Sequence, residues 1–431
     1  MTDKKNRNKI TRRNFLAATA VATTAISGFP FVHTSKAQER TKPLKFGVIG
    51  CGGRGTGAAD DALTATTNLH LIALADPFSD RIERCLKSLT NPKRRGGPLS
   101  GVEVKPDHIF VGMDCAQRLL ETDIDIAFLV SPPGFRPRNF EDAVNAGKHI
   151  FMEKPIATDP VGIRKVKKTA EKAKAKGLSV VVGLDNRHSK RTLETAKRIH
   201  DGQIGEIRYL RITRNGRGVW HRGSDPSWTP MEYQCRNWYY FCWLSGDQIT
   251  EQAIHHNDVI NMVMGGPPIS AYGSGGRMVR TDPKFGNIWD NMSIDFEYPG
   301  GVHLAHTNRH WENCDNRSEN FVVGTIGESN GSGRITGKNP WRWEGEMVTP
   351  KEYEHWELVE SIRNGQPRND VLDFAADSTL TTIMGRESCY TGKVITWDEI
   401  LNSDLDLLPK RLEFGPAPQR PVPIPGQPRL I

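Results

Sequence analysis

The sequence lacks a cysteine framework and lacks a hydrophobic run long enough to cross a membrane. Its seven cysteines are dispersed over 431 residues, and no two of them have CxxC spacing. An odd, scattered set argues against a disulfide scaffold and against a zinc site, so we expect packing cysteines and no metal. Residues 15–31 are apolar but diluted by Thr, Ser and Gly. A bilayer core needs about 20 apolar residues, so no stable membrane span is predicted.

Positive charge is also scarce once the N-terminus is set aside. The whole chain carries a net charge of +8, but residues 1–37 hold seven Lys or Arg residues against one acidic residue. The remaining chain is therefore close to +2. A charge this small does not indicate nucleic-acid binding, and we expect no nucleic-acid partner.

The N-terminal segment resembles a twin-arginine (Tat) export signal. Arg12 and Arg13 follow a basic start and precede the apolar run, and Ser35-Lys36-Ala37 offers small residues for cleavage. This order predicts a Tat signal peptide over residues 1–37, with the Tat machinery as a partner. The protein is then periplasmic or otherwise exported. The alternatives are a basic tail without a targeting role and a cytoplasmic enzyme whose N-terminus only mimics a signal.

A glycine-rich turn follows the first expected strand of the mature chain. Gly50 permits a tight turn, Gly52 allows a pyrophosphate to approach the backbone, and Gly55 allows close packing of helix and strand. Gly53 and Arg54 begin the following helix, whose free amides and dipole favour phosphate. The motif predicts a dinucleotide site; a glycine turn without a ligand is the plain alternative.

An acidic residue and a second strand–helix unit support this interpretation. Asp76 ends the next strand, 21 residues after Gly55, where a carboxylate accepts hydrogen bonds from the adenosine ribose. It would repel a 2′-phosphate, so NAD is favoured over NADP. A later strand ends at Ser131 and Pro132, which we also assign to the cofactor site. Alternating strands and helices predict an α/β fold, with a Rossmann doubly wound parallel sheet over residues 38–156.

The segment AGKHIFMEKP, which ends at Pro155, resembles the Gfo/Idh/MocA family of sugar and cyclitol oxidoreductases. The resemblance implies that Lys154 is the active-site lysine, placed beside the cofactor. Its ammonium would bind the reacting hydroxyl and stabilise the alkoxide that develops as hydride leaves. Glu153 would hold its surroundings. A surface lysine that merely ends a strand is the alternative.

The family's second signature is matched in part. Glu251, His255 and Asp258 would share one face of an α-helix, with His255 as the proton acceptor and Glu251 orienting the substrate or the histidine. Asp247, Glu251 and Ala253 replace the usual Gly, Asp and Gly, which puts simple inositol or glucose dehydrogenase activity in doubt. The alternative is a helix that carries one core and one surface histidine.

Other candidates concern the substrate. The aromatic-rich stretch 235–247 precedes this helix, and aromatic faces stack on sugar rings, although a domain core explains most of its aromatic residues. We assign substrate contacts to five side chains: Arg187, Arg236, Asn237, Trp238 and Asp258. Arg136 and Arg138 stand where family members often have a histidine, and they meet an acidic group or cap a helix.

In the second half of the chain the hydrophobic residues follow the alternating pattern of β-strands. Residues 206–215 and 291–311 alternate, and the turn at residues 299–301 predicts a hairpin. The resemblance implies a C-terminal α+β domain over residues 157–410, with a large, mainly antiparallel open sheet that forms a homo-oligomer, a dimer or tetramer. Residues 370–392 are expected to be helical, and residues 411–431 form a proline-rich arm that would lie across a neighbour.

Export and the dinucleotide motif together suggest a redox-neutral enzyme. The Tat route carries folded proteins, and outside the cytoplasm there is no evident NAD pool, so we expect a tightly bound, internally recycled NAD. Hydride would pass either from one sugar to a second carbonyl compound or out of and back into a glycoside during elimination and hydration. A non-catalytic sugar-binding relic is the alternative from a different class.

Overall fold

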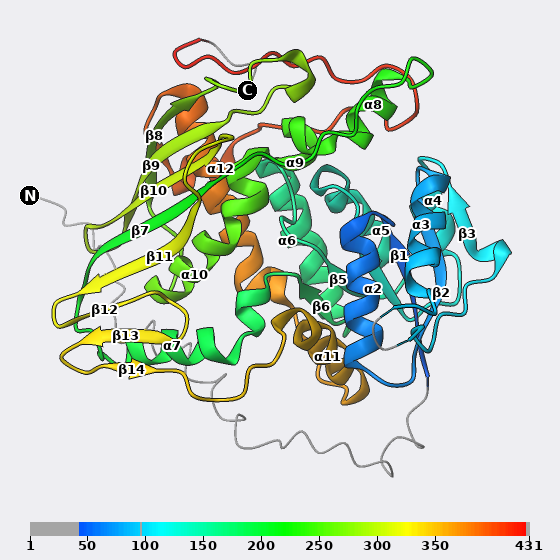
Figure 1. Ribbon diagram of the computed structural model, residues 1–431, viewed down its shortest axis with the longest axis horizontal. Helices are drawn as coiled ribbons and strands as arrows, with labels where there is room; N and C mark the ends of the chain where they lie inside the picture. Colours follow the sequence, from blue (N-terminus) through cyan, green and yellow to red (C-terminus); the bar gives the residue numbers. More distant parts are fainter. Residues whose placement is uncertain (1–42, 95–96, 428–431) are drawn as a thin grey trace, which may run out of the picture. The chain divides into compact units, whose positions relative to one another are not determined.

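The computed structural model describes residues 43–94 and 97–427 of the chain. The proposed signal peptide at residues 1–37 lies outside these residues. Within them, the strands form two sheets, one of six strands and one of nine (Figure 1). No helix in the described ranges combines the length and the apolarity needed to cross a bilayer.

The first sheet is parallel and has the order β3-β2-β1-β4-β5-β6. Its strands are β1 (Leu44–Ile49), β2 (Leu69–Asp76), β3 (Ile109–Val111), β4 (Ile126–Leu129), β5 (His149–Met152) and β6 (Val180–Val182). The strand order reverses between β1 and β4, which is where ligands bind at the carboxyl ends of open parallel sheets. The predicted Rossmann sheet is confirmed, and β6 extends it beyond the expected border at residue 156.

Helices connect these strands and cover the sheet. They are α2 (Gly53–Ala65), α3 (Ser79–Leu89), α4 (Cys115–Leu120), α5 (Arg136–Asn145) and α6 (Pro160–Ala175). A helix from the end of the chain, α11 (Pro350–Arg363), packs against α2 and β6 (Figure 1). The second half therefore contributes to the nucleotide-binding half, which the sequence pattern did not indicate.

The second sheet has the order β14-β13-β12-β11-β7-β10-β9-β8-β15. Its strands are β7 (Ile207–Gly216), β8 (Ser270–Gly276), β9 (Asn291–Tyr298), β10 (Val302–His310), β11 (Arg317–Gly324), β12 (Gly327–Ser329), β13 (Arg334–Gly337), β14 (Trp341–Arg342) and β15 (Ile395–Thr396). The predicted hairpin is β9–β10. The sheet is mainly antiparallel, as expected, although β7 and β10 run parallel.

One face of this sheet is covered by helices. Along β9 buried and exposed residues alternate, with Met292, Ile294, Phe296 and Tyr298 buried. The remaining helices are α7 (Lys190–His200), α8 (Pro230–Arg236), α9 (Cys242–Ser245), α10 (Ile254–Met264), α12 (Ala376–Thr391) and α13 (Trp397–Asn402). Of these, α10 and α12 lie along the inner face of the sheet (Figure 1). Six of the seven cysteines are buried and none is disulfide-bonded.

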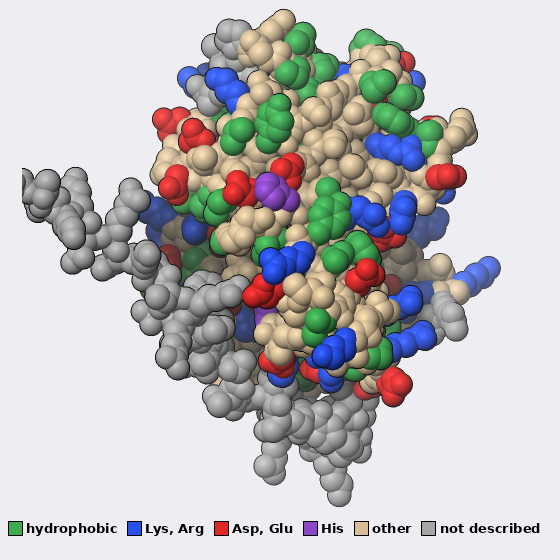
Figure 2. Space-filling model, turned by 90° about the vertical axis from the view of Figure 1, so that its left-hand side faces the viewer, with side chains coloured by type: hydrophobic (Ala, Val, Ile, Leu, Met, Phe, Trp, Pro, Cys, Tyr) green, Lys and Arg blue, Asp and Glu red, His purple; other side chains and the backbone are tan. Residues whose placement is uncertain are grey.

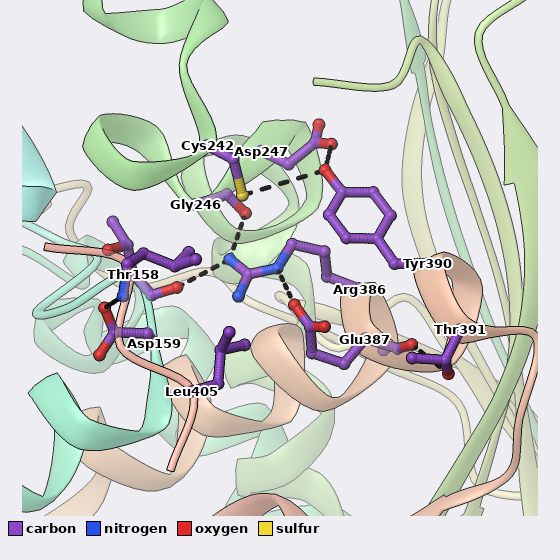
Figure 3. Close-up of polar contacts among 12 residues, drawn as sticks. Thr158, Asp159, Cys242, Gly246, Asp247, Arg386, Glu387, Tyr390, Thr391 and Leu405 are labelled. Carbon is purple, nitrogen blue, oxygen red and sulfur yellow. Dashed lines mark hydrogen bonds and ion pairs between the residues drawn. The ribbon is translucent and has the colours of Figure 1, made fainter. Parts of the chain in front are cut away.

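A buried arginine on α12 ties the two halves together (Figure 3). Arg386 is fully buried, donates to the carbonyl oxygens of Thr158 at 2.8 Å and Gly246 at 3.0 Å, and pairs with Glu387. Thr158 follows the β5 end that carries Lys154, and Gly246 precedes the segment that carries Glu251. The contact therefore fixes these two segments relative to each other.

Asp247, the residue that departs from the family's glycine, is structural. Its φ is +69°, a left-handed conformation that explains why glycine is usual there. Its carboxylate accepts from the backbone amides of Gln248 and Trp289. It also accepts from the hydroxyl of Tyr390 (Figure 3). Burial raises the pKa of Asp247 to about 6.

The proline-rich tail packs on its own chain. Gln234 donates to the carbonyl of Pro418 at 2.9 Å, and the indole of Trp289 donates to that of Pro423 at 3.1 Å. The tail, coloured red in Figure 1, runs beside α8 and α9. These two contacts hold the tail against its own chain at Pro418 and Pro423.

Candidate active site

A cavity of about 460 Å³ opens at the carboxyl ends of the parallel strands. The turn after β1, the ends of β2 and β5, and the β4–α5 turn line one side. Residues of the second half line the other side, among them Trp220, Arg222, Trp238, Glu251 and His255. The glycine turn, Lys154 and the segment that carries Glu251 and His255 therefore line one cavity.

The glycine turn forms a cradle that side chains would fill. Gly50 has φ +101°, and a Cβ atom there would lie 2.5 Å from the amide nitrogen of Ser131. A Cβ at Gly55 would lie 1.8 Å from the carbonyl oxygen of Gly50, whereas one at Gly53 would meet nothing within 4 Å. No side chain caps the N-terminus of α2. Its first amides remain available to a diphosphate, so this turn fits a dinucleotide.

Asp76 is held at the end of β2 by backbone amides. Its Oδ2 accepts from the Cys51 amide at 2.8 Å, and its Oδ1 accepts from the Phe78 amide at 3.0 Å. The residue is 6% exposed and lines the cavity. Burial raises the pKa of Asp76 to about 6. Each carboxylate oxygen keeps an unused acceptor site for a ribose hydroxyl.

Arg54 and Glu153, both predicted cofactor residues, pair with each other on the α2 side of the cavity. Arg54 Nε donates to Glu153 Oε1 at 2.6 Å. Glu354 of α11 reaches the same cluster, and burial, together with the charge of Glu153, raises its pKa well above the usual range. Glu354 and Lys351 line the cavity from a helix whose role the sequence pattern did not reveal.

Ser131 and Pro132 line the cavity at the end of β4, as predicted for cofactor contacts. The Ser131 carbonyl accepts from the buried guanidinium of Arg136 at 2.6 Å, and the Pro155 carbonyl accepts from the same group. Arg136 also lines the cavity. It braces the β4 turn against the loop that follows Lys154.

Lys154 points into the cavity and is engaged by Glu251. Its Nζ lies 2.9 Å from Glu251 Oε1 and 2.5 Å from the Glu251 carbonyl oxygen. Both side chains are 14% exposed. Glu251 lies in a π-helical turn, η6 (Ile249–Ala253), that precedes α10. Glu251 was expected to orient the substrate or the histidine, and in the structure its carboxylate contacts the lysine.

His255 has a different carboxylate as its neighbour. Its Nδ1 lies 3.2 Å from Oδ1 of Asp185, and both side chains line the cavity and are 29% exposed. Asp185 begins a short 3-10 helix, η4 (Asp185–His188), that follows β6. Burial opposes the charged form, but the contact with His255 and the charges of Lys351 and Lys154 hold the pKa of Asp185 at about 2. Sequence reasoning missed Asp185.

Four predicted substrate ligands do not line the cavity, and their assignment is corrected. Arg187 and the fully buried Asp258 pair with each other at 2.9 Å. Asn237 is fully buried, accepts from the Arg222 amide at 2.7 Å and donates to the Gly223 carbonyl at 3.1 Å. The fourth, Arg236, is bound by acidic side chains of α3 and α8.

Trp238 does line the cavity, beside Trp220. The two indole rings have centroids 5.9 Å apart in an edge-on arrangement. The predicted site thus keeps Trp238 as its aromatic wall, together with the glycine turn, Asp76, Lys154 and His255.

Comparisons with known proteins agree with this geometry. The chain is 27% identical over 251 residues to inositol 2-dehydrogenase of Rhizobium meliloti (strain 1021), which is 58% of this chain and 63% of that protein. It is 25% identical over 205 residues to a glycosyl hydrolase family 109 protein of Streptomyces coelicolor, which is 44% of this chain and 41% of the relative. The chain thus spans less than two thirds of the length of either relative.

Among solved structures, aldose-aldose oxidoreductase from Caulobacter crescentus, complexed with glycerol, superposes with a TM-score of 0.62 at 17% identity. The match covers 83% of this chain and all of the other. Residues 44–183 match the oxidoreductase family with an NAD-binding Rossmann fold, and residues 192–328 match the GFO/IDH/MocA C-terminal domain. The glycine turn, the cavity that contains Lys154 and both domain matches therefore place this chain in the Gfo/Idh/MocA family of oxidoreductases.

Proposed function

We propose that this protein is an exported oxidoreductase that acts on a hydroxyl group of a sugar, cyclitol or glycoside, with an NAD molecule that stays bound during turnover. The observation that carries the proposal is that Lys154 and His255 both line the cavity that is also lined by the glycine turn. The names of the relatives, which include an inositol dehydrogenase and an aldose-aldose oxidoreductase, support the substrate class.

The residues present fit the dinucleotide, with each part assigned to a group. The α2 amides at Gly52 and Gly53 would hold the diphosphate, and Asp76 would hold the adenosine ribose. A bound nicotinamide supplies a hydride acceptor beside the strand ends. Lys154 would donate a hydrogen bond to the reacting oxygen and stabilise its developing negative charge, while His255 would accept the hydroxyl proton.

Contacts between the two halves at the Asp76 end of the cavity support a retained cofactor. The Arg236 guanidinium lies 3.9 Å from the centre of the Phe78 ring, and its Nη1 lies 3.1 Å from Asp80 Oδ1. Phe414 of the tail packs against Phe78, and the centres of the two rings are 5.9 Å apart. These contacts join α3 to α8 and the tail beside Phe78, which lines the cavity next to Asp76.

Two redox-neutral cycles are compatible with a retained cofactor. In the first, hydride passes from one sugar to a second carbonyl compound, in line with the name of the Caulobacter crescentus structure. In the second, a glycoside hydroxyl is oxidised, the ketone acidifies the neighbouring C–H, the glycosidic oxygen is eliminated, water adds and the hydride returns. The similarity to a glycosyl hydrolase family 109 protein favours this second candidate.

A homo-oligomer, dimer or tetramer, belongs to the same proposal, with the outer face of the nine-stranded sheet as its interface. Figure 2 looks onto that side of the molecule, where acidic, basic and hydrophobic side chains are interspersed among polar ones. Tyr272 on β8 is 59% exposed there, and His303 pairs with Asp295 across β9 and β10.

The test begins with the mature protein purified from the exported fraction. Denaturation followed by mass spectrometry should release near-stoichiometric NAD, and turnover of glycosides or sugar–acceptor pairs should need no added NAD. Lys154→Met should keep the nucleotide and lose at least 100-fold in turnover. Lys168→Met, which removes an exposed lysine on α6, serves as the matched control and should change neither. A protein that releases no nucleotide and binds none when NAD is added would refute the proposal.

A further inference from the structure

His255 is placed so that only one of its ring nitrogens faces the cavity. Nδ1 is buried and lies 3.2 Å from Asp185 Oδ1, within ion-pair distance, but their relative orientation does not meet hydrogen-bond geometry, and Nδ1 has no hydrogen-bond partner among the described residues. The residue still lines the cavity. Nε2 is therefore the nitrogen that meets a ligand, and Asp185 is the group behind the ring.

The two elements that carry this pair are locked to each other. Arg187, two residues after Asp185, donates from Nε to both carboxylate oxygens of Asp258 on α10, at 2.9 and 3.0 Å. Asp258 is fully buried and also accepts from the hydroxyl of Ser378. The Nε–H is shared between both oxygens, and Nη2 donates to the Asp258 carbonyl at 3.3 Å, so these contacts join η4 to α10 one turn from His255 and hold the carboxylate and the imidazole near each other.

The other nearby carboxylate is already engaged. Glu251 accepts from Lys154 and contributes its backbone carbonyl to the same ammonium. The groups that face His255 are thus Asp185 from η4, Glu251 from η6, Lys154 from the end of β5, Lys351 from α11 and the adjacent His256. Of these, Asp185 alone has a distance to the imidazole that is short enough for an ion pair among the described residues.

We propose that Asp185 is the positioning residue for His255, an inference that rests on the proposed function. Its carboxylate favours the tautomer with the proton on Nδ1, which leaves Nε2 free to accept the substrate's hydroxyl proton. It also stabilises the imidazolium that forms once the proton has been transferred. The proton passes from the substrate oxygen to Nε2, and Asp185 remains ionised throughout.

Asp185→Asn removes the charge and keeps the size. We expect kcat to fall on the order of 100-fold with little change in KM, because a positioned base contributes roughly 10²–10⁴-fold. The acid limb of the pH–rate profile should move to lower pH, because the neutral amide no longer favours the protonated ring. Asp185→Glu should restore part of the activity. Asp404→Asn, which changes a carboxylate whose side chain is 97% exposed, is the matched control and should behave as the unmodified protein.

A double-variant cycle separates positioning from a fold defect. In a His255→Gln background, Asp185→Asn should cause no further loss, and all variants should retain the same amount of released nucleotide. An unchanged kcat and pH profile in Asp185→Asn would overturn the inference, as would additive losses in the double variant.

Nitrogen NMR of the histidine side chains gives a readout that does not need turnover. With His255→Gln as the assignment control, the ring should be protonated at Nδ1 in the unmodified protein and shift toward the other tautomer in Asp185→Asn. If the protein neither binds NAD nor turns over, the proposed function fails while this measurement still decides the role of Asp185. An unchanged tautomer in Asp185→Asn would overturn that role.

Discussion

The pKa of Asp76 leads to a quantitative prediction for cofactor binding. Burial raises this pKa to about 6 in the free protein. The amides of Cys51 and Phe78 each use one acceptor site, one per carboxylate oxygen, so the ionised form retains one site per oxygen for a ribose diol. Protonation turns one of these acceptors into a donor. We therefore expect NAD to bind the carboxylate form of Asp76.

The sign and size of the effect follow from this linkage. A group with a pKa of about 6 is almost fully ionised at pH 8 and roughly one-tenth ionised at pH 5. The affinity for NAD should therefore fall about tenfold between pH 8 and pH 5, which corresponds to about 1.4 kcal/mol. Asp76→Asn should bind NAD about 10- to 100-fold more weakly, because a hydrogen bond to a charged group contributes about 1.5–3 kcal/mol.

The assay is equilibrium binding of NAD to nucleotide-stripped protein, followed by intrinsic tryptophan fluorescence at half-unit steps between pH 5 and pH 8. The Asn variant has no group that titrates at residue 76, so its curve should be flat over this range. A wild-type affinity that does not change with pH would refute the reasoning. So would an Asn variant that keeps the wild-type slope, because the titrating group would then lie elsewhere in the cavity.

Three further predictions test the cradle, the closure of the cavity and the buried carboxylate. Gly55→Ala should lose bound NAD, because its Cβ would lie 1.8 Å from the carbonyl oxygen of Gly50. Gly53→Ala is the control and should keep NAD, because its Cβ would meet nothing within 4 Å. Mass spectrometry of the nucleotide released on denaturation measures the bound NAD in each variant. Arg236→Ala should release NAD roughly 5- to 30-fold faster in stopped-flow experiments, because the ion pair of Arg236 with Asp80 and its contact with the Phe78 ring together contribute about 1–2 kcal/mol. Arg208→Ala, which changes an exposed arginine, is the control and should have no effect. Burial raises the pKa of Asp247 from 3.8 to about 6, so the folded state binds its proton more tightly than the unfolded state, and the free energy of unfolding should fall by about 2 kcal/mol from pH 4 to pH 6. Asp247→Asn should reduce this slope in urea titrations at each pH; a slope equal to that of the unmodified protein would contradict the assignment.

The parts of the site that could be predicted from the sequence are local in the chain. The glycine turn and Asp76 belong to one strand–helix–strand unit, whose geometry is fixed by chain connectivity. Lys154 follows the last residue of β5, and parallel strands bring their carboxyl ends to one edge of the sheet. Short-range rules were therefore sufficient to place these residues in one cavity.

The site residues that the sequence did not place correctly are those whose partners lie far away in the chain. An α-helix places residues 251 and 255 on one face, but the π-turn over Ile249–Ala253 changes that spacing, and Glu251 contacts Lys154 instead. Asp185 lies far from His255 in the chain, and only the docking of η4 on α10 brings the two together. Arg236 and Asn237 stand in an aromatic-rich stretch, which suggested a sugar site, but α8 uses both for contacts that join segments of the protein.

The charges at the reacting end of the cavity favour an uncharged substrate. Lys154 is paired with Glu251, and the His255 ring faces Asp185, so the ammonium and the imidazole each have a neighbouring carboxylate. Lys351 adds one exposed cation at the rim. A substrate carboxylate or phosphate would have to compete with carboxylates that are already in contact with the lysine and the histidine, whereas a neutral hydroxyl donates and accepts hydrogen bonds without displacing either. This arrangement of charges around Lys154 and His255 is in line with the proposed uncharged sugar or cyclitol substrate, although the exposed Arg222 also lines the cavity.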